Sequence, residues 1–281
     1  MRERHGVGSA TAGAAGLLVL VLIAGAAPWL PVAAPYATNL DARLRTPSVD
    51  EPLGRDSLGR DVLARMVHGA RISLAVGLCT VAVSLTLGVL LGALAGYLGG
   101  WTDELISRTV DVLLAFPGIL LAVALAAIMG PTLPNVVIAL SVLGWTGYAR
   151  LTRTQVMTLR QRDFVAAARV LGVGPVRIVW RHILPLAAPL LLVQATFGLS
   201  GAILAEAALS FLGLGVPPPL PSWGAMLDEG RMFMLVAPHL VLAPGLALAV
   251  TVLALQLLGD GLRDVLDFGD VRTPQRWHRE Q

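Results

Sequence analysis

Lysine is absent from this sequence, and charge of either sign is scarce. Only 14% of the 281 residues are charged, whereas a soluble domain carries about 25%, and 56% are hydrophobic. Together with a mean hydropathy of +0.74, this balance indicates an integral membrane protein. Without lysine the chain cannot form a Walker A phosphate-binding loop, a Schiff-base lysine or a lysine general base.

Cysteine is also scarce, and clustered histidine is missing. Cys79 is the single cysteine, so no disulfide can form within the chain, and the histidines lack metal-ligand spacing. The sequence pI of 9.7 comes from arginines that flank apolar runs, which argues against a nucleic-acid partner. No His, Cys or carboxylate pair stands at helical spacing in an apolar run, so we predict no metal site and no catalytic residues. An integral-membrane enzyme is the weakest of the alternatives.

Apolar runs long enough to cross a hydrocarbon core of roughly 30 Å recur along the chain. They predict an all-α protein with about six transmembrane helices. The expected spans are 11–30, 72–98, one ending near Met129, 133–152, 186–212 and one within 232–259. The turn GPTLPN at 130–135 divides a charge-free run, 112–149, that is too long for one crossing. For the first run, a cleaved signal peptide is the alternative, because Arg2 and Arg4 precede it and small residues follow.

Arginine is concentrated between the fourth and fifth predicted spans. Residues 150–181 contain seven arginines and one acidic residue, Asp163, so the positive-inside rule predicts that this loop is cytoplasmic. An even number of spans then places both termini on the same side. We expect the polar residues 51–71 and the proline-rich residues 213–226, the latter as a stiff extended loop, on the opposite side.

Glycines at 88, 92, 96 and 100 lie at every fourth position of the second predicted span. This spacing gives one smooth helix face that another helix can approach closely. The partner helix could belong to this chain or to another subunit.

The stretch DFVAAARVLGVGPVRIVWRHILP, residues 163–185, predicts two short amphipathic helices joined by a bend. We expect Asp163 to cap the first helix, Gly172 and Gly174 to end it, and Pro175 to begin the second. The expected apolar faces are Phe164, Ala167, Ala168 and Leu171 in the first helix, and Val176, Val179, Trp180 and Ile183 in the second. Such a pair either lies on lipid headgroups or fits a groove on a soluble partner.

Four acidic residues are candidate functional groups. Asp56 and Asp61 end two copies of LGRD, and we favour turn formation and helix capping over substrate contact. Asp61 would cap a helix with Leu63, Met66, Val67 and Ala70 on one face and Arg65 off it. For Asp111 we expect an ion pair with Arg108, three residues earlier. Glu206, in the fifth predicted span, either lines a translocation path or is a satisfied structural carboxylate.

Residues 163–185 resemble the cytoplasmic "EAA" loop of ABC-transporter permeases. Ala167, Ala168, Gly172, Leu184 and Pro185 match the pattern, whereas Ala166 stands where the family often has Glu, and His182 stands at its Ile position with Ile183 beside it. Residues 51–74, 205–227 and 257–267 resemble segments of dipeptide, oligopeptide and nickel permeases.

The resemblance implies an ABC type I importer permease with about six transmembrane helices. It implies a bacterial inner-membrane location, both termini in the cytoplasm and a first span that is retained. The expected regions are a tail, first helix and start of an outer loop over 1–50, an extracytoplasmic interfacial segment over 51–71, a permease core over 72–260, and a cytoplasmic tail over 261–281. Within the core, residues 153–185 would form the coupling loop.

The implied function is import of di- or oligopeptides, with a nickel or other small-solute importer as the alternative. The implied partners are a second permease subunit, two cytoplasmic ATP-binding subunits that hold ATP and Mg²⁺, an extracytoplasmic substrate-binding protein, and membrane lipid. No cofactor is expected in this chain. The implied coupling residues are Ala166, Ala167, Ala168, Gly172, Ile183, Leu184 and Pro185. A stand-alone secondary transporter using Glu206 and Asp111 as ion sites is the alternative from another class.

Overall fold

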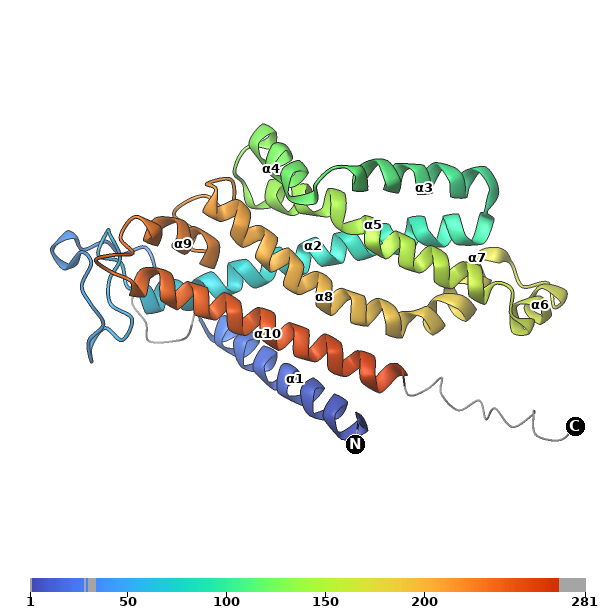
Figure 1. The fold of residues 1–281 in the computed structure, drawn as a ribbon, viewed down its shortest axis with the longest axis horizontal. Helices are drawn as coiled ribbons and strands as arrows, with labels where there is room; N and C mark the ends of the chain where they lie inside the picture. The colour runs from blue at the N-terminus through green and yellow to red at the C-terminus, as the bar shows by residue number, and fades with distance from the viewer. Residues whose placement is uncertain (1, 28, 30–33, 268–281) are drawn as a thin grey trace, which may run out of the picture.

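The computed structural model describes residues 2–27, 29 and 34–267. Within these residues the predicted all-α architecture is confirmed, and long helices lie along one another (Figure 1). The helices are α1 (Arg2–Ala26), α2 (Val62–Leu98), α3 (Gly100–Ala115), α4 (Gly118–Met129), α5 (Leu133–Leu159), α6 (Asp163–Val170), α7 (Pro175–Ile178), α8 (Leu184–Phe211), α9 (Trp223–Arg231) and α10 (His239–Asp267). A 3₁₀ turn, η1 (Leu40–Ala42), precedes α2, and a π turn, η2 (Val179–Ile183), joins α7 to α8.

Four helical segments of the described chain are long and apolar enough to cross a membrane: Val7–Ala26, Val62–Leu98, Pro175–Phe211 and His239–Leu266. The third predicted span is not one straight helix, because α3 and α4 meet at an angle of 87°. Phe116 is extended before Pro117, as a residue preceding proline tends to be, and this ends α3. The fourth predicted span corresponds to α5, whose 27 residues measure about 40 Å but include arginines in the second half.

The second span begins earlier than predicted. The Asp61 side chain accepts a hydrogen bond from the Ala64 N–H at 2.9 Å, so α2 starts at Val62 and continues to Leu98 without a break. The predicted cap is therefore confirmed. The prediction that Arg65 lies off the packed face is wrong, because Arg65 is 2% exposed.

The glycine face of α2 packs against α5 of the same chain. A Cβ atom at Gly88 would lie 2.7 Å from the Trp145 carbonyl oxygen, and one at Gly96 would lie 2.7 Å from that of Arg153. Gly92 faces the Ala149 backbone between them. Gly100 takes no part, because it has a φ of +56° and begins α3. The predicted packing surface is thus three glycines long, and its partner is internal.

The remaining helices pack onto this pair. α8 contacts α2 and α5, α10 packs on α8, and α1 runs along α10 (Figure 1). Gly13 of α1 is close enough to α10 that an added Cβ would lie 2.6 Å from the Ala254 carbonyl oxygen. The prediction of a first span over 11–30 includes residues 28 and 30, which lie outside the described residues, as does the predicted tail beyond residue 267. Up to Asp267 that tail is part of α10.

Different elements lie at the two ends of the bundle (Figure 1). Residues 34–61 and α9 lie at one end, whereas α6, α7, the start of α1 and the last turn of α10 point toward the other (Figure 1). The expectation of an extended loop through 213–226 is wrong in its last part. The Ser222 side chain accepts a hydrogen bond from the Ala225 N–H at 3.2 Å and caps α9. This helix was not predicted from the sequence, because the prolines before it indicated an extended loop.

Candidate functional sites

A cavity of about 370 Å³ lies between α2, α4, α5 and α8. Glycine, alanine and aliphatic side chains form most of its wall, and none of its lining residues is charged. Its polar lining residues are Thr80, Ser84, Tyr148 and Gln194. The cavity can therefore accept an uncharged or weakly polar group of small-molecule size.

Three hydroxyl groups in this wall have no hydrogen-bond partner among the described residues: those of Thr80, Ser84 and Tyr148. The side chains are buried, with exposures of 4%, 1% and 4%. Their oxygen atoms are covered by neighbouring atoms, and an unsatisfied buried polar group costs about 1–3 kcal/mol. Glycines make room for two of them, because a Cβ at Gly144 would collide with the Ser84 hydroxyl and one at Gly198 with that of Tyr148.

Glu206 lies on α8 beside this cavity but is not among the residues that line it. Its side chain is fully buried and accepts hydrogen bonds from the hydroxyls of Ser210, at 2.7 Å, and Ser73, at 3.3 Å. The Ser73 hydroxyl in turn accepts the Trp223 N–H at 3.2 Å, so the cluster ties α8 to α2 and α9. This geometry favours the structural alternative for Glu206, and its role in a path stays a prediction.

The Asp111 carboxylate pairs with a different arginine from the one predicted. It accepts a hydrogen bond from Arg150 of α5 at 2.7 Å, whereas Arg108 lies 3.8 Å from Glu104. The expected pairing is wrong because α3 turns Asp111 toward α5. Both side chains of the Asp111–Arg150 pair are more than half exposed, so it is not a buried ion site.

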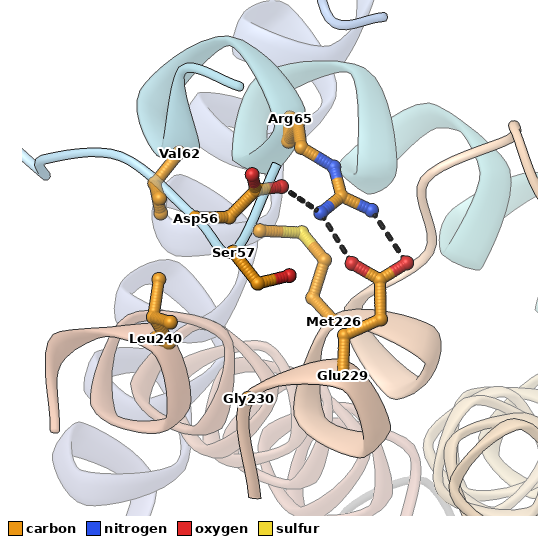
Figure 2. A pocket seen from close by; sticks show the side chains of 8 residues that line it. All are labelled: Asp56, Ser57, Val62, Arg65, Met226, Glu229, Gly230 and Leu240. Carbon is orange, nitrogen blue, oxygen red and sulfur yellow. Dashed lines mark hydrogen bonds and ion pairs between the residues drawn. The ribbon is translucent and has the colours of Figure 1, made fainter. Parts of the chain in front are cut away.

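A buried network of four charged residues joins the loop before α2 to α9. Figure 2 shows the Arg65 guanidinium between the carboxylates of Asp56 and Glu229. Arg65 bonds Glu229 through two nitrogens, at 2.6 and 3.0 Å, and Asp56 at 2.6 Å. Arg60 also bonds both carboxylates at 2.6 Å. Two positive and two negative groups therefore balance in a largely enclosed site.

This network bears on the interpretation of Asp56. Besides the two arginines, the Asp56 carboxylate accepts the backbone N–H groups of Leu58 and Arg60, both at 2.9 Å. The Asp56 carboxylate therefore stabilises a turn and fixes the two arginines, which agrees with the favoured interpretation of Asp56 as a turn-forming residue. Sequence reasoning did not identify Glu229 as a partner, since no local pattern connects it to Arg65.

Gly172 ends α6 in the left-handed conformation, with a φ of +78°. The Gly172 N–H donates a hydrogen bond to the Arg169 carbonyl, and the Val173 N–H donates one to the Ala168 carbonyl, both at 3.0 Å. This pair of hydrogen bonds is the Schellman motif. The predicted bend is confirmed as backbone geometry, and Pro175 begins α7 as expected. Asp163 is not the cap, because it is the first residue of α6 and Arg162 precedes it without a side-chain cap.

The predicted apolar faces of the coupling loop divide between the core and the surface, because Ala168, Val179 and Ile183 are buried whereas the other large members are exposed. Val165, Ala168, Ile178 and Ile183 are buried against the ends of α2 and α5, and Leu184 lies with them. The residues Phe164, Val170, Leu171, Val176 and Trp180 are exposed by 39%, 87%, 82%, 71% and 57%. Of the implied coupling residues, Ala166, Ala167, Gly172 and Pro185 are also exposed. The loop thus presents an apolar surface that no described part of the chain covers.

Three comparisons place these features among known proteins. The family model described as "Binding-protein-dependent transport system inner membrane component" matches residues 88–269. The dipeptide transport system permease protein DppC of Alkalihalophilus pseudofirmus is 46% identical over 255 residues, which cover 90% of this chain and 84% of that protein. The glutathione transport system permease protein GsiD of Pectobacterium atrosepticum is 47% identical over 258 residues, covering 90% and 85%.

The fold has a solved counterpart. A chain from the inward-facing MetNI methionine ABC transporter superposes with a TM-score of 0.59 at 20% identity, covering 72% of this chain and 97% of that one. At this level of identity the likeness concerns the fold alone.

Proposed function

This chain belongs to the family of binding-protein-dependent transport system inner membrane components, and we propose that the solute it carries is a short peptide. As a member it is a permease subunit of an ABC transporter, located in the inner membrane, and it is a transport component rather than an enzyme. ATP-binding subunits are its partners.

The observation that carries the substrate proposal is the pair of relatives at 46% and 47% identity over 90% of the chain. One is named for dipeptide transport and the other for glutathione transport, and both solutes are short peptides. The cavity of about 370 Å³ has the size of a small-molecule site. We propose that the peptide passes it during translocation.

The coupling loop is the proposed contact with the ATP-binding subunits. Its exposed apolar side chains, among them Leu171, Val176 and Trp180, suit a groove on a soluble partner. The arginines around it favour the cytoplasmic side, and the start of α1 and the end of α10 point the same way (Figure 1). In this arrangement ATP and Mg²⁺ are bound by the partners, the second permease and the substrate-binding protein complete the importer, and this chain holds no cofactor.

The connections on either side of the coupling loop support a mechanical role. η2 continues directly into α8, so Pro175–Phe211 forms one long helical segment, and α5 enters the loop from the other side. Both helices also carry residues of the cavity wall, including Tyr148 on α5 and Gly198 on α8. Closure of the ATPases would therefore move two walls of the cavity as rigid levers.

Reconstitution of the complete importer tests the proposal. The permease pair, ATP-binding subunits and binding protein are placed in liposomes, and uptake of a labelled dipeptide and of glutathione is measured. We expect ATP-dependent accumulation of at least one of these peptides. If neither accumulates while the same liposomes import another solute, the peptide assignment is wrong.

A matched pair of variants tests the docking surface. Trp180→Ala removes an exposed side chain of the coupling loop, and Trp101→Ala removes one that is 76% exposed at the start of α3. We expect only the first variant to reduce copurification of the ATP-binding subunits. Equal retention in both variants would place the docking surface elsewhere.

A further inference from the structure

We infer that the groove on the ATP-binding subunit that receives the coupling loop has an apolar floor and carboxylate groups along one side. The inference rests on the proposed function, because it assigns a charge pattern to the docking partner proposed for this loop. Its starting point is the set of arginines in and before the loop, some of which the chain itself engages while others have no partner among the described residues.

Four of the seven arginines at 150–181 are held by other residues of the chain. Two form ion pairs with carboxylates of α3, and two contact Tyr97 at the end of α2. These four are Arg150, Arg153, Arg160 and Arg169. The other three, Arg162, Arg177 and Arg181, are exposed, and their side chains have no hydrogen bond or ion pair with any residue that the structure describes. The loop therefore carries positive charge that the described part of the chain does not balance.

The arginines of α7 and η2 form one edge of this short helical segment. Arg177 and Arg181 are four residues apart, and so are Val176 and Trp180, which are 71% and 57% exposed. Residues four apart lie on one face of a helix, so a basic edge and an apolar edge run side by side. The opposite face is buried against the ends of α2 and α5.

Acidic groups are scarce in the same loop. Asp163 is the single carboxylate at 150–181, and Ala166 stands where ABC permeases often have Glu. A partner that encloses the apolar edge must offer an apolar surface, and one that encloses the basic edge must offer anions, because an enclosed charge without a partner is costly. An apolar groove with carboxylates on the side of Arg177 and Arg181 satisfies both edges.

The direction of the two edges favours a soluble partner over the lipid surface. The buried face of α6 and α7 rests on the ends of α2 and α5, and α2 is one of the apolar spans. The exposed edges lie on the other side of α7, away from these helices, and α6 and α7 lie at one end of the bundle (Figure 1). Lipid headgroups would have to reach the arginines from the side that the bundle already occupies.

Charge variants of the complete membrane complex in nanodiscs test the inference. Arg177→Gln/Arg181→Gln removes both positive charges of the edge, and Arg177→Glu/Arg181→Glu reverses them. Arg43→Gln/Arg45→Gln is the matched control, because these two arginines are also exposed but lie in the loop at the other end of the bundle (Figure 1). The dissociation constant of the ATP-binding subunits is measured by dilution of the complex, at low and at high salt. Each measurement is made in zwitterionic lipid and again with anionic lipid added.

We expect the double Gln variant to raise this dissociation constant about tenfold at low salt, because one exposed ion pair changes an affinity by up to about fivefold. The double Glu variant should bind more weakly still, since like charges would then face one another. Both differences should shrink at high salt, which screens exposed charges. The control should bind like the wild type, and the lipid should make no difference.

Three outcomes would overturn the inference. The first is a double Gln variant that binds like the wild type in zwitterionic nanodiscs. The second is a loss of binding that requires anionic lipid, which would assign the arginines to headgroups. The third is a double Glu variant that binds as well as the double Gln variant, which would show that no carboxylates face this edge. Failure of the proposed docking surface is a separate result, because Trp180→Ala and Trp101→Ala would then retain the ATP-binding subunits equally.

Discussion

The charge network between α2 and α9 gives the sharpest stability prediction. Glu229→Gln keeps the volume of the side chain but removes one of the two carboxylates that neutralise Arg60 and Arg65. Asp56 would then face two guanidinium groups alone. The Arg60 and Arg65 side chains are only 8% and 3% exposed, so water cannot replace the lost charge.

The magnitude follows from the burial of the partners. Removing one member of a buried ion pair costs about 3–5 kcal/mol, because the other charge is left uncompensated. Glu229 itself is 30% exposed, which places the expected cost near the lower end, at about 3 kcal/mol. Since about 1.4 kcal/mol corresponds to a factor of ten, separation of α9 from the loop should become roughly 100-fold more frequent.

Hydrogen exchange on the assembled transporter measures this opening. Amides of α9 and of residues 53–61 should exchange about 100-fold faster in Glu229→Gln, while those of α6 keep their protection. Asp228→Asn is the control on the same helix, because its partner Arg231 is 53% exposed and such pairs contribute less than about 1 kcal/mol. Similar exchange in both variants would show that the network does not hold α9 in place.

Three further predictions concern single positions. Gly92→Val should separate α2 from α5 and abolish recovery of folded protein from detergent, whereas Gly147→Ala, with no neighbour within 4 Å, should be tolerated at normal yield. Gly172→Val should abolish substrate-stimulated ATPase activity while membrane insertion persists, because a β-branched residue is strained at a φ of +78°. Gly174→Ala, with no neighbour within 4 Å, is the control. Normal coupling in Gly172→Val would refute the lever role. Glu206→Gln should retain uptake and substrate preference. Glu206→Ala should lower the free energy of unfolding by about 1–3 kcal/mol, measured by thermal unfolding. A changed substrate preference in Glu206→Gln would instead support a role for Glu206 in the translocation path.

Several features set by local sequence were predictable, although the Asp163 cap was not. Glycine spacing indicated the packed face of α2, because residues four apart lie on one side of a helix. The Gly172 bend and the Asp61 cap followed from backbone rules that involve a few neighbouring residues. The family resemblance placed the coupling loop, and the family match now covers that segment.

Features set by distant contacts were not predictable. Arg65 is buried because Glu229, 164 residues later, completes its charge balance, and no periodicity reports such a pair. Asp111 finds Arg150 across a helix interface instead of Arg108 in its own turn. The break between α3 and α4 could have been predicted from Pro117, because proline disfavours the helical conformation of the residue before it. The hydrophobicity of this segment alone does not indicate the break.

The same distinction applies to the cavity, which the packing of several helices forms. Thr80 and Ser84 are unremarkable in an apolar span, because a hydroxyl there usually bonds to its own helix. Only the packing of α2, α4, α5 and α8 shows that both residues lie in the wall of a cavity together with Tyr148, with their hydroxyl oxygens covered by neighbouring atoms. α5 and α8 also flank the coupling loop, so movement of the loop would change the spacing of the cavity walls. A cavity whose walls are moving helices can have a different shape in each state, which is what directional transport requires.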